Sequence, residues 1–216
     1  MTTRLLYVMD PMCSWCWGFA PVVEALAKQA AASGVPLHTV LGGLRQEQAA
    51  LDPLNEARIL GYWQNVHAMT GQPFTTALPE GLVYNTEPAC RALVTARRLD
   101  QDSVWPLLRL IQHAFYVDGL DVTRGPLLAE LAERAGIPRI EFAELFDSDQ
   151  MLAATAADFE WVQCLGIAGF PTLLAERDGQ FALLTNGYRP LEELAPLLAR
   201  WLERGGVRAP GESQTS

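Results

Sequence analysis

Two cysteines separated by two residues, Cys13 and Cys16, have the spacing in this sequence that points most directly to chemistry. They follow an apolar run at residues 4–9, which predicts a buried strand, and they stand where apolar residues begin to recur at helical spacing. The first N–H groups of a helix lack partners within it and the helix dipole is positive there, so both stabilise a thiolate at Cys13. Cys16, one turn further, faces any mixed disulfide formed at Cys13. The pattern therefore predicts thiol–disulfide exchange, with Cys13 as nucleophile and Cys16 as resolving cysteine.

Two other interpretations of this pair are structural thiols and one half of a zinc site. Zinc normally takes a second closely spaced pair, whereas Cys90 and Cys164 stand far apart. These two cysteines fall at apolar helical positions, so we expect inert buried thiols, with a bridge between them or a second redox pair as the alternative. The histidines show no metal-site spacing. We therefore expect no metal.

A second candidate element is the sequence Gly169-Phe170-Pro171-Thr172, which directly precedes a predicted strand. It resembles the loop that carries a cis-proline in thioredoxin-like proteins. A proline at position 171 removes an N–H beside the cysteines, so the preceding peptide is free to pair with an extended substrate backbone. The alternative is an ordinary proline at the start of a strand.

The residues around the two motifs are candidates for substrate contact. We expect Ser14, Trp15 and Phe170 to contact substrate, and we include Trp17, which is equally suited to the core or a pocket wall. Asp10 lies just before the motif. Its carboxylate would relay a proton, oppose thiolate formation, or serve simply as a turn residue before a proline.

The elements that position these motifs follow from periodicity and capping signals. Residues 4–9, 14–31 and 37–41 predict a parallel, right-handed strand–helix–strand unit. Residues 44–148 predict helices and no strand, with Asp52, Thr86 and Ser148 as side chains that cap helices. A strand pair around Asp178-Gly179 predicts a hairpin, and a final helix follows it.

The predicted order is that of an α/β, thioredoxin-like fold (βαβαββα) with a large all-helical insertion between the second strand and the helix that precedes the proline loop. Residues 1–43 and 149–206 would form the thioredoxin-like domain, residues 44–148 the helical insertion domain, and residues 207–216 a disordered tail. The insertion is expected to cover the cysteine face and form an apolar groove.

These residues carry a resemblance that extends from residue 1 to about residue 205. The run of residues 10–19 around the C-x-x-C motif and the Gly-Phe-Pro-Thr loop, with a helical block between them, resemble the DsbA-like family of thioredoxin-fold disulfide oxidoreductases. The similarity is to its leaderless bacterial branch of protein-disulfide isomerases, which includes the FrnE-like proteins. The resemblance implies a redox-active disulfide, with Cys13 as nucleophile, Cys16 as resolving cysteine and Pro171 as the cis-proline.

Composition narrows the partners and the compartment. The chain has 216 residues and a net charge of −9, which argues against a nucleic-acid binder. No apolar run approaches the roughly 18 residues of a membrane helix, and the run near the start is shorter than a secretory leader requires. We therefore expect a soluble, cytoplasmic enzyme that contacts neither nucleic acid nor membrane.

The expected activity is that of a protein-disulfide oxidoreductase or isomerase. Its partners would be proteins or small molecules that carry thiols or disulfides, together with glutathione or the thioredoxin system. We expect no bound cofactor, with glutathione as a co-substrate. The alternatives are a glutathione-dependent isomerase or transferase of the kappa-class type, and a non-catalytic peptide-binding module with a vestigial dithiol.

Overall fold

A four-stranded sheet forms the centre of the computed structural model, which describes residues 2–204. Its order is β2-β1-β5-β6, with β1 and β2 parallel and the other pairs antiparallel. The bounds are β1 (Thr3–Met9), β2 (Leu37–Leu41), β5 (Thr172–Arg177) and β6 (Gln180–Asn186). β1 is an inner strand and its last five residues are buried, which explains its nearly continuous apolar sequence. The predicted tail, residues 207–216, lies outside the described residues.

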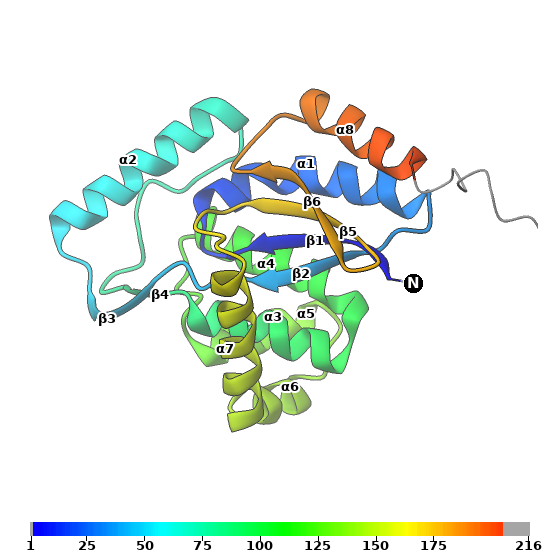
Figure 1. Cartoon of the computed structure of the whole chain (residues 1–216). Helices are drawn as coiled ribbons and strands as arrows, with labels where there is room; N and C mark the ends of the chain where they lie inside the picture. Colours follow the sequence, from blue (N-terminus) through cyan, green and yellow to red (C-terminus); the bar gives the residue numbers. More distant parts are fainter. Residues whose placement is uncertain (1, 205–216) are drawn as a thin grey trace, which may run out of the picture.

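Helices cover both faces of this sheet (Figure 1). α1 (Ser14–Ala31) and α8 (Leu191–Glu203) lie together on one face, and α3 (Glu87–Leu99), α5 (Gly125–Arg134), α6 (Arg139–Phe146) and α7 (Asp149–Cys164) lie on the other. α4 (Val104–Tyr116), entered through the short turn η1 (Gln101–Ser103), packs against α3 and α5 and also touches α1. The predicted thioredoxin-like arrangement with a helical insertion is confirmed.

The insertion also contains strands that the sequence analysis missed. β3 (Gln46–Ala50) precedes α2 (Pro53–Thr70) in the chain and β4 (Val83–Asn85) follows it. The two strands pair as a two-stranded antiparallel sheet. The prediction of no strand within residues 44–148 was wrong because every residue of β3 is exposed and β4 has only 3 residues. Neither strand can therefore show the alternation of apolar and polar residues that marks a half-buried strand.

Local signals account for the element boundaries. The Asp52 and Ser148 side chains accept hydrogen bonds from the first turns of α2 and α7, as expected of capping residues. Asp178 and Gly179 both have positive φ, at 50° and 78°, which matches the tight hairpin turn between β5 and β6. Thr86 is the N-cap residue of α3, as predicted, but its side chain makes no capping bond to the helix, and its hydroxyl donates to the buried carboxylate of Asp10.

The free edge of β2 is covered by a side-chain ion pair. Arg97 of α3 and Asp158 of α7 form two hydrogen bonds of 3.0 and 2.9 Å. Arg97 also donates to the Thr39 carbonyl, and Asp158 accepts from the Leu41 N–H. The pair therefore occupies backbone groups that an edge strand would otherwise present to another chain.

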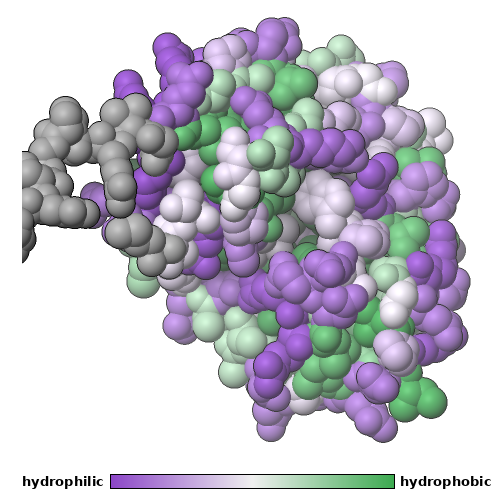
Figure 2. Space-filling view, turned by 90° about the vertical axis from the view of Figure 1, so that its right-hand side faces the viewer, coloured by the Kyte–Doolittle hydropathy of each residue, from purple (hydrophilic) through white to green (hydrophobic). Residues whose placement is uncertain are grey.

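The face shown in Figure 2 is turned away from α2. Hydrophilic and hydrophobic residues are intermixed there, with the hydrophobic ones in separate small groups. Within residues 2–204, no helix combines the length and apolar character needed to cross a membrane.

Candidate active site

Cys13 and Cys16 lie at the start of α1, directly after β1, with Cys13 as the N-cap residue. The Cys13 carbonyl accepts hydrogen bonds from the N–H groups of Cys16 (2.9 Å) and Trp17 (3.1 Å), and its own N–H donates to the Asp10 carbonyl. Cys13 is 5% exposed, whereas Cys16 is completely buried. An incoming disulfide can therefore reach only Cys13.

Burial controls the protonation of the second thiol. It raises the pKa of Cys16 well above the ordinary value, and a hydrogen bond with Cys13 acts in the same direction. The Tyr7 hydroxyl lies 3.5 Å from the Cys16 carbonyl oxygen, and burial likewise raises the pKa of Tyr7. Cys16 is therefore a neutral thiol at neutral pH and carries a proton that it can give up when it reacts.

The proline loop lies opposite Cys13. The Phe170–Pro171 peptide bond is cis, and the Cys13 thiol approaches the Phe170 carbonyl oxygen at 3.7 Å. Thr172 fixes the loop, because its hydroxyl donates to the Gly169 carbonyl at 2.8 Å. The Phe170 ring packs directly on the backbone of Gly42, where a Cβ atom would lie 1.9 Å from the ring. A glycine at position 42 is therefore required by the ring at position 170.

A pocket of about 270 Å³ opens beside Cys13. Aromatic and aliphatic side chains from α2, the β2–β3 segment, β4 and the proline loop form most of its wall, which suits the apolar parts of a peptide or thiol. Its lining consists of Met12, Cys13, Ser14, Trp15, Leu44, Arg45, Ile59, Tyr62, Trp63, Tyr84 and Phe170.

The predicted substrate-contacting residues divide between two places. Ser14, Trp15 and Phe170 line the pocket beside Cys13, and Trp15 also packs against Tyr188 at 5.9 Å. Trp17 does not line it: its ring stacks on another ring 6.0 Å away and its Nε1–H donates to a loop carbonyl. Trp17 instead lines a separate cavity between α1 and α4.

Asp10 is the buried polar centre behind the motif. Its carboxylate accepts hydrogen bonds from the N–H groups of Met12 (2.8 Å) and Leu44 (2.7 Å) and from the Thr86 hydroxyl (2.6 Å). Burial raises the pKa of Asp10, and these hydrogen bonds oppose that shift. Asp10 therefore ties the end of β1 to the segment after β2 and to the start of α3.

The other two cysteines have different environments. Cys90 is buried as predicted, its thiol lies 3.5 Å from the carboxylate of Asp10, and burial raises its pKa. Cys164 is exposed, so the prediction of a buried thiol there was wrong. It is the last residue of α7. Within residues 2–204 no group of three or more His, Cys, Asp or Glu residues is placed to hold a metal ion.

Sequence reasoning missed several residues of the pocket, namely Leu44, Arg45, Tyr62, Trp63 and Tyr84. One signal was available for the first two. Because β1 and β2 are parallel, the residues that follow both strands meet at the same edge of the sheet, so the segment after residue 41 must lie beside the cysteines. The α2 and β4 residues depend on how the insertion folds back, and no local pattern carries that information.

The parallel β1–β2 pair, the antiparallel hairpin and the cysteine pair at the start of α1 define a thioredoxin-fold protein of the disulfide oxidoreductase class. The chain belongs to the family of DSBA-like thioredoxin domains, whose model matches residues 4–199. No match was found among proteins with curated descriptions.

Solved structures agree with this assignment. A "putative protein disulfide isomerase" from Nitrosomonas europaea is 43% identical, with a TM-score of 0.87, and the match covers 94% of this chain and 99% of that one. The cytosolic disulfide reductase DsbM from Pseudomonas aeruginosa is 28% identical, with a TM-score of 0.75 and coverage of 93% and 99%. A second structure of DsbM was determined with GSH, and it has a TM-score of 0.71, 28% identity and coverage of 92% and 98%. The chain is therefore an enzyme of the thiol–disulfide oxidoreductase type.

Proposed function

We propose that this protein is a disulfide reductase in which Cys13 is the nucleophile and Cys16 the resolving cysteine. The observation that carries the proposal is the asymmetry of the pair. Cys13 borders an open pocket beside the proline loop, whereas Cys16 is completely buried one turn further along α1. Only one sulfur can meet a substrate, and the other is held where it can reach the first.

In the proposed cycle, the Cys13 thiolate attacks one sulfur of a substrate disulfide. A Cys13–substrate disulfide forms, the substrate S–S bond breaks, and one substrate thiolate leaves. Cys16 then loses its proton, which the second leaving thiolate takes up, and its sulfur attacks Cys13. The Cys13–Cys16 disulfide forms as the mixed disulfide breaks, so two electrons have passed to the substrate. Two glutathione thiols restore the dithiol and leave as glutathione disulfide.

The similarity to DsbM, a cytosolic disulfide reductase whose structure was also determined with GSH, supports reduction as the direction and glutathione as the electron donor. We accordingly propose a cytoplasmic location, with proteins or small molecules that carry disulfides as substrates.

Cysteine variants test this proposal. We expect Cys13→Ser to abolish reduction of a model disulfide and Cys16→Ser to accumulate a mixed disulfide, visible as added mass that a reductant removes. Cys164→Ser is the matched control, because that thiol is exposed but lies on α7, and it should leave the rate unchanged. Disulfide reduction by Cys13→Ser at the wild-type rate would refute the assignment.

A further inference from the structure

We propose that Arg45 makes this site selective for acidic disulfides and thiols over neutral and basic ones. The inference rests on the proposed function, because it concerns which substrates the Cys13 pocket accepts. Arg45 is the charged residue among those that line the pocket. The other residues that line this pocket are uncharged. The guanidinium of Arg45 is therefore the main group that distinguishes acidic from basic substrates.

Arg45 is held close to the reacting sulfur through one aromatic ring. Its guanidinium carbon lies 5.0 Å from the centre of the Tyr84 ring, a cation–π arrangement. The hydroxyl of that tyrosine donates to the Met12 carbonyl at 2.7 Å, and Met12 immediately precedes Cys13. A carboxylate a few bonds away from a disulfide sulfur would therefore meet Arg45 when that sulfur meets Cys13.

The backbone of Arg45 is fixed by the same buried centre that holds the cysteine motif. Its N–H donates to the Thr86 hydroxyl at 3.3 Å, and its carbonyl accepts from the Thr86 N–H at 2.9 Å. The Thr86 hydroxyl in turn donates to Asp10, which also holds the N–H of Leu44. Asp10 and Thr86 thus act as positioning residues that place Arg45 relative to Cys13.

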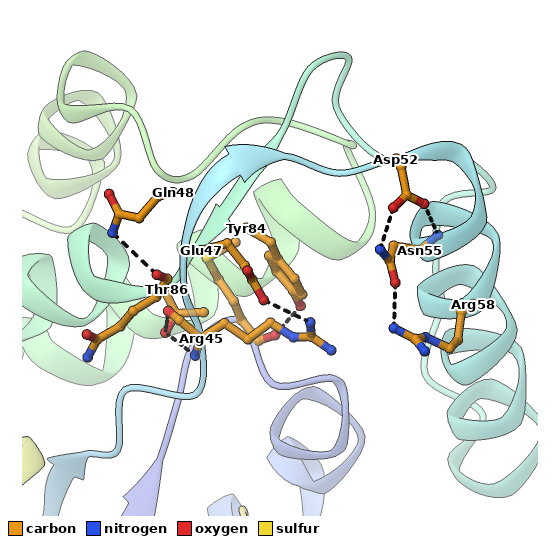
Figure 3. A network of polar contacts seen from close by, with 10 residues as sticks. Arg45, Glu47, Gln48, Asp52, Asn55, Arg58, Tyr84 and Thr86 are labelled. Carbon is orange, nitrogen blue, oxygen red and sulfur yellow. Dashed lines mark hydrogen bonds and ion pairs between the residues drawn. The ribbon is translucent and has the colours of Figure 1, made fainter.

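The guanidinium keeps capacity for a ligand. Its ion pair with Glu47 is long, at 3.7 Å, and the Glu47 side chain is half-exposed, so the pair occupies little of the binding capacity of Arg45. Figure 3 shows that Arg58 of α2 extends toward Arg45 from the opposite side, where it donates to Asn55, which in turn bonds Asp52. Arg58 is not among the residues that line the pocket, so Arg45 is the guanidinium at its wall, with Glu47 as its opposing charge.

This local charge opposes the charge of the whole molecule. The chain carries −9, so an acidic substrate is repelled at long range and gains its preference only close to the pocket. Screening by salt should weaken the preference because Arg45 is partly solvent-accessible. Arginine also binds a carboxylate through two parallel hydrogen bonds, which a lysine cannot reproduce.

The test compares three small disulfides that differ in charge: glutathione disulfide (acidic), hydroxyethyl disulfide (neutral) and cystamine (basic). Reduced protein is mixed with each in a single turnover, and the second-order rate constant is measured by mass spectrometry after acid quenching. We expect the acidic-to-basic rate ratio to exceed the ratio for a simple dithiol by roughly tenfold at low salt. Arg45→Ala should remove this excess, and Glu47→Gln should increase it.

Arg139→Ala is the matched control, since Arg139 also has a loose glutamate partner, at 3.9 Å, but lies on α6. It should keep the wild-type ratio. An acidic-to-basic ratio equal to that of a simple dithiol, or a ratio that Arg45→Ala leaves intact, would overturn the inference while the reductase proposal stands. If the wild-type protein reduces none of the three disulfides, the proposed function itself fails.

Discussion

Gly42→Ala should damage both stability and activity, because it places a methyl group inside the Phe170 ring. An ideal Cβ at position 42 would lie 1.9, 2.3 and 2.7 Å from three atoms of that ring. An ordinary contact begins at 3.4 Å, so the nearest ring atom must move by about 1.5 Å (3.4 − 1.9). Overpacking of this kind costs about 1–3 kcal/mol of unfolding free energy. The Phe170 carbonyl faces the Cys13 thiol, so the rate of disulfide reduction should fall as well.

The assay is urea unfolding combined with single-turnover reduction of a model disulfide. Gly61→Ala is the matched control. Gly61 lies inside α2 with open space around its Cβ position, so alanine there should stabilise the protein by about 0.5–1 kcal/mol. The double variant Gly42→Ala/Phe170→Val removes the ring that clashes. Its stability should match that of Phe170→Val alone, which isolates the coupling between the two positions.

Two results would refute this reasoning. One is a Gly42→Ala protein as stable as wild type, which would mean that the ring moves aside at no cost. The other is an equal Gly42→Ala penalty in the wild-type and Phe170→Val backgrounds, which would place its cause outside the Gly42–Phe170 contact.

Three further predictions concern buried charge and thiol access. Arg97→Ala should lower the unfolding free energy by about 1–3 kcal/mol in urea titrations, because Asp158 loses its partner and the β2 edge opens. Burial raises the pKa of Asp10 in the folded protein. The stability that protonated Asp10 contributes is therefore complete below the ordinary pKa and is lost as the pH rises through the folded-state pKa. The unfolding free energy of wild type should fall relative to that of Asp10→Asn from about pH 4 upward. Iodoacetamide should modify exposed Cys164 and spare buried Cys90 in the folded protein, as peptide mass mapping would show; equal labelling would contradict the burial described.

Much of the fold follows from the sequence because its core elements carry strong local signals. The apolar run that became β1, the helical spacing of α1 and the Asp178-Gly179 turn each predicted an element that the structure contains. β3 was not predicted from the sequence because Gln46–Ala50 is exposed on both faces and pairs with β4, which lies far along the chain. Such a strand is defined by a non-local pairing that periodicity cannot reveal.

The site was predictable in its cysteine pair and proline loop, and less so in its walls. The C-x-x-C spacing predicted the two cysteines that the structure places at the start of α1, but Trp15 and Trp17, which look equivalent in sequence, face different cavities. Their separation depends on where α2 and the loop after it pack against α1, which is a property of the insertion as a whole. Asp10 was recognisable as a candidate from its place before the motif, yet two of its three donors come from residues 44 and 86, far along the chain.

The reduction potential of the Cys13–Cys16 pair tests the central claim most directly. The protein is equilibrated in glutathione buffers of graded ratio and free thiols are trapped. The fraction of dithiol is read by peptide mass spectrometry, which separates the Cys13–Cys16 peptide from Cys90, and Cys164→Ser is the background because it removes the exposed thiol. The account of a disulfide reductase predicts a potential near −270 mV, close to that of thioredoxin. A potential near −120 mV, as in a strong disulfide oxidant, would contradict it.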